Sequence, residues 1–321
     1  MDLIYTSAKG ADIGVLSAYS FDLSFGASEN DFEIILDANE AALEDGAFIY
    51  IEGTEYGGIN DGIKAATNGE TVTYKGRTWH GIINSKVICP NAGTDYYAAS
   101  GEANAILHSI IARLGLSDLF SASLDDSGIN ISKYQFARYC KGYDGIRAML
   151  ESVNAKLRIE WKNRKVILSA VPIADYTEAP IDGDIATLTV EKHQKKVNHL
   201  ICLGKGELSA REVIHLYVDQ FGRIGNTQYF TGLEEIADTY ENTNAESSEE
   251  LRKGGNDRLK ELRSNDKAEI ALLETEGLFY DIGDIVGATE YKTGVNVTET
   301  VTQKIVKINN GVISTEYKTG S

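Results

Sequence analysis

Short apolar runs separated by turn signals dominate the first ninety residues. Phe32–Leu36 and Ala47–Ile51 are rich in aromatic and β-branched residues, and Asp45-Gly46 and Gly57-Gly58 are turn signals beside them. Lys75-Gly76 interrupts a further alternating run and predicts a two-residue hairpin loop. Short strands at this spacing predict a small barrel or sandwich.

The pattern becomes helical between residues 95 and 172. A first helix is expected after Ser100 as its N-cap, and Gly115 is expected to end it; its apolar face is Ala103, Ile106, Leu107, Ile110, Ile111 and Leu114. A second helix is expected to start at Asp144. Residues 157–161 then alternate as a strand, and a turn at 162–164 leads into another strand. This order predicts an α+β unit.

Strand patterns return from about residue 186 and continue to the end. The polar segment 242–264 carries Leu251, Leu259 and Leu262 on one possible helical face. Its Gly254-Gly255 pair costs about 1 kcal/mol per glycine relative to alanine, which predicts a broken helix or a small helical insertion. Asn310-Gly311 joins the last two apolar runs and is a strong hairpin signal.

The predicted fold class is α+β, mainly β. Residues 1–92 form a first β unit, which strands near 165–190 could complete, and residues 93–182 form an inserted α+β domain. Residues 183–321 form a second β unit with a helical insertion at 242–264. Pro172 and Pro180 flank the polar junction. Two β units of similar size suggest a duplicated barrel.

The composition excludes some partners. The chain has 321 residues, with 48 Asp and Glu against 31 Lys and Arg, so its formal net charge is -17. A protein that grips nucleic acid through its phosphates needs the opposite sign, although ordinary bacterial acidity explains the value equally well. The N-terminus lacks a signal-peptide pattern and no apolar run reaches bilayer length, so we expect cytoplasmic folding without membrane insertion.

Residues suited to metal binding or thiol chemistry lack the necessary spacing. None of the histidines, at positions 80, 108, 193, 199 and 215, fits a metal-ligand motif. His193 and His199 fit neither one helical face nor a tight strand pair, so ordinary hydrogen-bonded or surface histidines are expected. The cysteines, Cys89, Cys140 and Cys202, are far apart and are predicted to be small core residues.

Candidate catalytic and phosphate-binding motifs also have better structural explanations. The carboxylate pairs Asp125-Asp126, Glu234-Glu235 and Glu249-Glu250 lie in polar settings and are expected to be solvated. Gly204-Lys205-Gly206 lacks the spacer and Lys-Ser/Thr pair of a phosphate loop, and 125–128 lacks the final Glu of a calcium loop. We therefore expect no catalytic, cofactor-binding or metal-binding residue and no enzymatic activity.

One stretch resembles a known family. It includes Val197–Leu208, Arg211–Val213 and Leu216–Asp219, with Gly232–Ile236 and Ile282–Val286 downstream. These residues resemble the hub proteins of phage-tail baseplates: the siphovirus tail-associated proteins and the hubs of PBSX-like prophages and contractile bacteriocins. The specific resemblance covers about residues 190–290, and the order of elements agrees over the whole chain.

The resemblance implies a structural role in the virion tail, assembled in the host cytoplasm. Such hubs carry two tail-tube-like β-barrels, and three copies form a pseudo-six-fold ring. The ring would join the tail tube or distal tail protein to a separate spike or tip. DNA or a tape measure would pass through it without specific binding, and an acidic lumen would suit that passage. Because the chain stops after its last hairpin, a short hub without a peptidase or fibre domain is expected.

Two other functions compete with this interpretation. An all-β receptor- or carbohydrate-binding tail protein would need an exposed aromatic platform, whereas Trp79 and Trp161 lie in patterns that predict core positions. An acidic glycosidase would need two carboxylates across a cleft, and no pair in the sequence indicates one.

Overall fold

The computed structural model describes residues 2–39, 43–66, 69–177, 186–191, 196–263, 267–273, 279–290 and 295–320. The chain divides into two compact units. The first comprises Met1–Leu188 together with Glu269–Gly320, and the second comprises Thr189–Ala268. Strands dominate both units, which confirms the α+β, mainly β, fold class.

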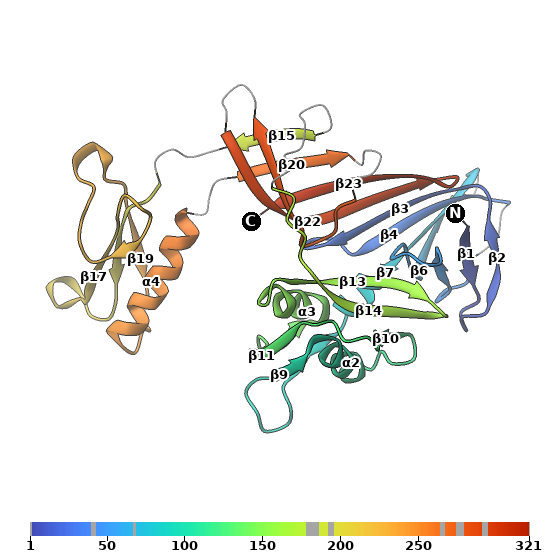
Figure 1. Cartoon of the computed structure of the whole chain (residues 1–321), viewed down its shortest axis with the longest axis horizontal. Coiled ribbons are helices and arrows are strands. Elements are labelled where there is room, and N and C mark those ends of the chain that lie inside the picture. Colours follow the sequence, from blue (N-terminus) through green and yellow to red (C-terminus); the bar gives the residue numbers. More distant parts are fainter. Residues whose placement is uncertain are drawn as a thin grey trace. The chain divides into compact units, whose positions relative to one another are not determined.

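One large sheet in the first unit joins strands from both ends of the chain (Figure 1). The early strands are β1 (Leu3–Thr6), β2 (Asp12–Leu16), β3 (Tyr19–Gly26), β4 (Asp31–Asp37), β5 (Phe48–Tyr50), β6 (Gly57–Ala65) and β7 (Thr71–Thr78). The later strands are β15 (Ala186–Glu191), β20 (Lys267–Leu273), β21 (Ile285–Glu290), β22 (Val295–Asn309) and β23 (Val312–Gly320). Their order is β15-β20-β23-β22-β3-β4-β7-β6-β5-β1-β2, with β21 paired to β22.

The two halves of this sheet meet where β22 pairs antiparallel with β3. Strand alternation builds the core there: Phe21, Leu23 and Val306 are fully buried, whereas Asp22 and Lys307 on the same strands face outward. The sheet therefore has one apolar face and one polar face.

Of two hairpins predicted from the sequence, one is confirmed and the other is wrong. Asn309 lies opposite Val312, and Asn310 and Gly311 both have positive φ, so the predicted β22–β23 hairpin is confirmed. The predicted hairpin at Lys75-Gly76 is wrong, because both residues lie inside β7. A Cβ on Gly76 would lie 1.9 Å from the Ile59 carbonyl oxygen, so this glycine permits a close approach of strands and not a turn.

The rest of the first unit is the α+β region. Its elements are α1 (Trp79–Asn84), β8 (Val87–Ile88), β9 (Ala98–Glu102), α2 (Ala103–Arg113), β10 (Phe120–Ala122), β11 (Asn130–Gln135), β12 (Cys140–Lys141), α3 (Gly142–Glu151), β13 (Ala155–Lys162) and β14 (Lys165–Pro172). Helix α2 contacts β10 and β14, and α3 contacts β13 (Figure 1). The two predicted helices and the β13–β14 hairpin are confirmed.

The predicted helix starts need correction. Ser100 lies within β9, and Glu102 caps α2 because its carboxylate accepts hydrogen bonds from the backbone N–H groups of Asn104 and Ala105. Helix α3 begins at Gly142, which places Asp144 in its first turn and not at its cap. An acidic side chain is favourable in either position, so the residue type alone did not locate the boundary.

An aromatic cluster packs the α+β region against the large sheet. The rings of Trp79 and Trp161 stack with centroids 5.1 Å apart, and Tyr50 stacks on Trp161 at 4.2 Å. Trp79 is completely buried and Trp161 is 3% exposed. Their predicted core positions are confirmed, and neither ring forms an exposed platform.

The second unit is a four-stranded sheet covered by one helix. Its elements are β16 (His199–Leu203), η1 (Leu208–Ala210), β17 (Val213–Val218), β18 (Ile224–Gly225), η2 (Gly232–Glu234), β19 (Ala237–Glu241) and α4 (Ser248–Arg263). The strand order is β18-β17-β16-β19. Leu200, Cys202 and Leu216 from the sheet pack with Leu251 and Leu259 of α4 in a separate small core.

Of the two alternatives for residues 242–264, the small helical insertion is confirmed and the broken helix is wrong, because α4 runs without interruption through Gly254-Gly255. A Cβ on Gly255 would lie 2.4 Å from the sulfur of Cys202, and one on Gly254 would lie 2.4 Å from the hydroxyl of Tyr240. The glycines therefore let the helix lie close to the sheet, and this packing offsets their low helix propensity.

This division differs from the sequence grouping of residues 183–321 as one β unit. Residues 196–263 have their own core, whereas β22 and β23 continue the sheet of the N-terminal strands. Among the described residues the large sheet forms one path from β15 to β2, so the arrangement as two separate barrels stays a prediction. The predicted junction near Pro180 lies outside the described residues. No helix in the described ranges has the length and apolarity needed to span a bilayer.

Candidate functional site

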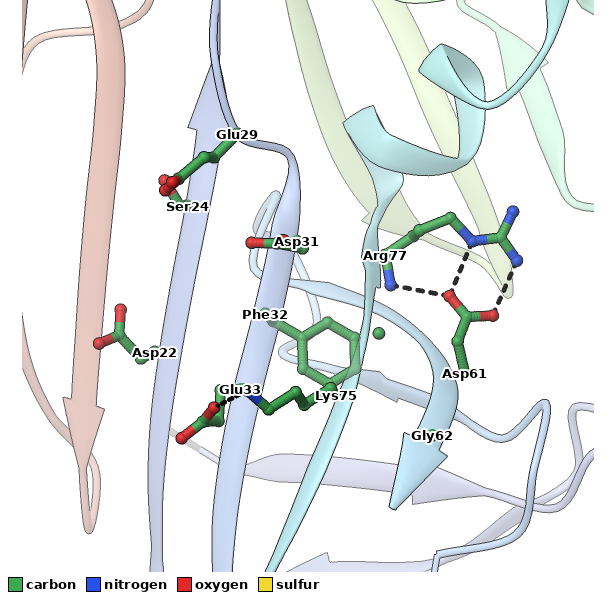
Figure 2. Close-up of a pocket in the computed structure, with 11 residues that line it drawn as sticks. Asp22, Ser24, Glu29, Asp31, Phe32, Glu33, Asp61, Gly62, Lys75 and Arg77 are labelled. Carbon is green, nitrogen blue, oxygen red and sulfur yellow. Dashed lines mark hydrogen bonds and ion pairs between the residues drawn. The ribbon is translucent and has the colours of Figure 1, made fainter. Parts of the chain in front are cut away.

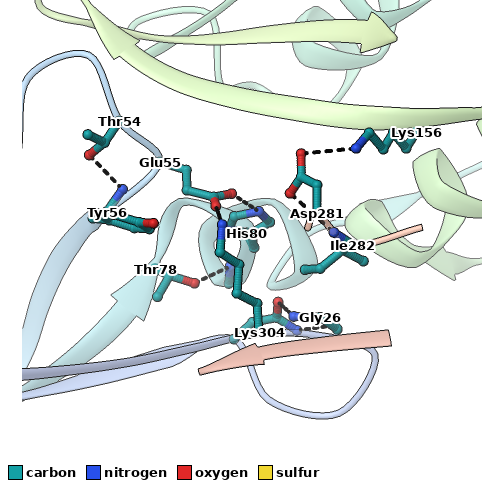
Figure 3. A network of polar contacts seen from close by, with 12 residues as sticks. Gly26, Thr54, Glu55, Tyr56, Thr78, His80, Lys156, Asp281, Ile282 and Lys304 are labelled. Atoms are coloured by element: carbon teal, nitrogen blue, oxygen red, sulfur yellow. Dashed lines mark hydrogen bonds and ion pairs between the residues drawn. The ribbon is translucent and has the colours of Figure 1, made fainter. Parts of the chain in front are cut away.

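A cleft of about 830 Å³ in the first unit is lined by polar and aromatic side chains from distant segments. The turn at 53–56, strand β13, the segment 279–284 and Lys304 of β22 all contribute to it. Figure 3 shows the charged side chains of this region, with Glu55 between Lys304 and His80 and with Asp281 facing Lys156.

The centre of this network is a buried ion pair. The Lys304 Nζ lies 2.6 Å from the Glu55 Oε1, and the two side chains are 9% and 13% exposed. Burial alone would lower the pKa of Lys304, but Glu55, Tyr56, Asp281 and Tyr317 together outweigh it and raise that pKa above its ordinary value. His80 lies 3.7 Å from Glu55, and its complete burial lowers its pKa to about 3, so His80 is neutral at pH 7.

A second buried pair holds the segment 279–284 against β13. The Lys156 Nζ lies 2.7 Å from Asp284 Oδ1 and 3.5 Å from Asp281 Oδ2. Asp284 also accepts hydrogen bonds from the backbone N–H groups of Ala174 and Asp281. Burial raises the pKa of Asp281, and the nearby Glu55 raises it further. Two lysines against three carboxylates compensate most of the charge, and the ion pairs connect the turn at 53–56 with β22 and the segment 279–284 with β13.

The outward face of the large sheet is acidic. A hollow of about 480 Å³ on it is lined by Asp22, Glu29, Asp31 and Glu33, and Figure 2 shows these carboxylates on β3, β4 and the turn between them. Burial raises the pKa of Asp22 and of Asp31, and neighbouring carboxylates raise both, whereas Lys307 lowers the pKa of Asp22 and Lys75 lowers that of Asp31.

Two ion pairs partly balance this face. The Lys75 Nζ lies 2.6 Å from Glu33, and the Arg77 guanidinium donates two hydrogen bonds to Asp61 (Figure 2). Four carboxylates of the hollow thus face two lysines, Lys75 and Lys307, because Arg77 is occupied by Asp61. The face therefore carries an excess of negative charge.

The carboxylate pairs predicted from the sequence to be solvated do not converge on a site. Asp125-Asp126 lies exposed in the turn after β10, and Glu249-Glu250 lies exposed in the first turn of α4. Glu234 is exposed, whereas Glu235 is half-buried and binds a histidine. Gly204-Lys205-Gly206 forms a turn between β16 and β17. The absence of catalytic residues stays a prediction.

The sequence missed a pair of histidines in the second unit. The Nε2 of His199 lies 2.8 Å from the Nδ1 of His215, and the Nδ1 of His199 lies 2.5 Å from Glu235. The two histidines lie on neighbouring antiparallel strands, and only the register of those strands brings them together. His193, the partner considered from the sequence, lies outside the described residues.

The cysteines differ in their surroundings. Cys202 is buried in the core beneath α4 and Cys140 is half-buried, but Cys89 is exposed, so its predicted core position is wrong. Within the described residues, no group of three or more His, Cys, Asp and Glu side chains is placed to hold one metal ion.

The fold is similar to solved structures of phage-tail proteins. The 43 kDa tail protein of prophage MuSo2 from Shewanella oneidensis is 10% identical, with a TM-score of 0.57 over 99% of this chain and 98% of that one. The prophage tail protein gp18 from Listeria monocytogenes EGD-e is 14% identical, with a TM-score of 0.55 over 99% and 94%. A chain of the phage P2 baseplate in its activated conformation is 11% identical, with a TM-score of 0.53 over 99% and 98%.

This chain has the fold of phage tail and baseplate proteins. The similarity extends over almost the whole length of both chains in each comparison, so it includes the α+β region and the second unit. It confirms, at the level of the fold, the resemblance carried by residues 190–290. No protein-family model and no curated protein sequence matches the chain.

Proposed function

We propose that the protein is a structural hub subunit of a phage-tail baseplate. The observation that carries this proposal is the full-length similarity to prophage tail proteins and to a phage P2 baseplate chain. A fold alone does not define a function, but the buried charges of the cleft are mutually paired, as in a packed structural region. A structural role accounts for both facts.

In this proposal three copies surround the tail channel as a pseudo-six-fold ring. The ring joins the tail tube to a separate spike or tip. Strands from both ends of the chain lie in one sheet, so the N-terminal and C-terminal β regions would move as one body in such a ring. A closed ring also shields the free strand edges that a single subunit presents.

We further propose that the acidic face of β3, β4 and the turn between them lines the channel. Its carboxylates repel the phosphates of DNA, which lets DNA pass without binding. The excess of carboxylates in the hollow of Figure 2 supports this orientation. The competing function of a receptor- or carbohydrate-binding tail protein gains no support from the aromatic cluster, because its tryptophans are buried.

Cryo-electron microscopy of tails assembled with this protein tests the proposal. We expect three copies around the channel, between the tube and the spike, with Asp22 and Asp31 facing the lumen. A peripheral position on a receptor-binding appendage would contradict the hub function. A channel wall formed by another face of the sheet would contradict only the orientation. Specific binding or turnover of cell-wall glycans by the purified protein would contradict a purely structural role.

A further inference from the structure

The sheet of the second unit has two different faces. Leu200 and Leu216 point toward α4 and are almost completely buried. On the opposite face β16 carries His199 and β17 carries His215, and the proposed hub function uses neither. His199 is largely buried, whereas His215 is exposed to solvent. The pair therefore has one fixed member and one accessible member.

Hydrogen bonds determine which nitrogen of His199 is available. Its Nδ1 lies 2.5 Å from the Glu235 carboxylate, which can only accept, so this nitrogen carries a hydrogen. In neutral His199 the Nε2 then has a free lone pair, and it is directed at the Nδ1 of His215, 2.8 Å away. The ring of His199 also stacks on Tyr217 with centroids 4.4 Å apart, which fixes its orientation.

We propose that His199 and His215 together bind one divalent late transition-metal ion, such as Zn²⁺. A carboxylate behind a liganding imidazole orients the ring and increases its basicity, and Glu235 already occupies that position. Neutral imidazole nitrogens favour Zn²⁺, Cu²⁺ and Ni²⁺ over the oxygen-seeking Ca²⁺ and Mg²⁺. Glu235 faces the other ring nitrogen of His199, so it supports the site without being a ligand.

Binding requires His215 to move aside, because the Nε2 lone pair of His199 is directed at the His215 Nδ1 and the ion would occupy that direction. Two nitrogens at about 2.1 Å from a tetrahedral Zn²⁺ are roughly 3.4 Å apart, compared with the present 2.8 Å. The exposed ring of His215 can supply this movement, and its proton transfers from Nδ1 to Nε2 through solvent. Water completes the coordination, because His215 is exposed to solvent. The ion then links β16 to β17.

Calorimetric titration of the untagged full-length protein with Zn²⁺ tests the proposal. We expect one ion per chain, with binding lost in His215→Gln. Glu235→Gln is expected to weaken binding by about tenfold or more, because it removes the carboxylate behind His199. Two variants serve as matched controls: His108→Gln removes an exposed histidine of α2, and Cys89→Ser removes the exposed thiol. Both are expected to retain the wild-type affinity and stoichiometry.

A second measurement covers the case in which a variant fails to fold. Nuclear magnetic resonance of the wild-type imidazole groups is expected to show that Zn²⁺ shifts the ring signals of His199 and His215 and leaves those of His108 unchanged. No saturable binding by the wild type would overturn the proposal. Unchanged binding by folded His215→Gln, or loss of binding in Cys89→Ser, would overturn it as well.

Discussion

Individual side chains in this protein connect segments that are separate in the sequence. Glu102 shows this most clearly. Besides capping α2, its carboxylate accepts hydrogen bonds from the backbone and the hydroxyl of Ser127. Burial would raise the pKa of Glu102, but these hydrogen bonds and the two from the helix outweigh it and lower that pKa to about 2. The ionised form is therefore stabilised in the folded protein.

Replacing Glu102 with Gln is expected to lower the free energy of unfolding at pH 7 by about 1 kcal/mol, the usual size of a lost N-cap interaction. Because the folded-state pKa lies below the ordinary value of 4.5, the contribution of Glu102 is complete above that value and is lost as the pH falls toward 2. Urea unfolding of both proteins at pH 7 and near pH 3 measures this. A difference in stability that is equally large at both pH values would contradict the explanation.

Packing between elements explains why α4 and β7 each contain a glycine, although glycine is unfavourable inside a helix or a strand. In α4, Gly255 lies against Cys202, where a methyl group has no room. In β7, Gly76 lies against the backbone of β6. In both places the requirement comes from a neighbouring element and not from a turn.

Gly255→Ala is expected to destabilise the protein, although alanine has the better helix propensity by about 1 kcal/mol. The added Cβ would overlap the Cys202 sulfur, and such overpacking typically costs about 1–3 kcal/mol. Thermal unfolding followed by circular dichroism measures the effect. Adding Cys202→Ala removes the overlapping atom and is expected to recover part of the loss. A single variant more stable than the wild type would contradict the packing argument.

The ion pairs of the cleft connect parts of the chain that are far apart in sequence. Glu55 follows β5, whereas Lys304 lies on β22, so their pairing ties the N-terminal turn to the C-terminal strand. A buried pair is weak support for stability by itself, but breaking one leaves an uncompensated charge. The network is therefore expected to matter most when only one partner is changed.

Lys304→Met is expected to cost about 3–5 kcal/mol, because Glu55 then remains buried without its cation. Glu55→Gln combined with Lys304→Met removes both charges and is expected to be more stable than Lys304→Met alone. Chemical denaturation of the two single variants and the double variant gives the coupling energy. Additive effects would show that the two side chains do not depend on each other.

The proposed channel face leads to a prediction for the assembled particle. Asp22→Lys together with Asp31→Lys reverses charge at exposed positions of the large sheet, so the fold is expected to remain intact. Particles with this variant are expected to release DNA more slowly, because lysines would bind the passing phosphates. Ejection kinetics measured at low and high salt test this, since added salt screens the effect. A matched pair, Asp125→Lys with Asp126→Lys in the turn after β10, is expected to leave the rate unchanged.

The sequence by itself determined the type of most elements. Strand alternation, the apolar faces of α2 and α3, and the Asn310-Gly311 turn act over a few residues, so their physics is readable locally. The resemblance at residues 190–290 indicated the tail-protein fold that the structural comparisons support. The buried positions of Trp79 and Trp161 also followed from their local patterns.

Only the tertiary structure decided which distant segments meet. The pairing of β22 with β3, the ion pair of Lys304 with Glu55 and the contact of His199 with His215 each depend on strand register or on packing between elements. No local pattern specifies these contacts, because the same alternation allows many registers and many partners. The turn predicted at Gly76 and the helix break considered at Gly254-Gly255 do not form for the same reason: neighbours far away in the chain determine how much space a residue has.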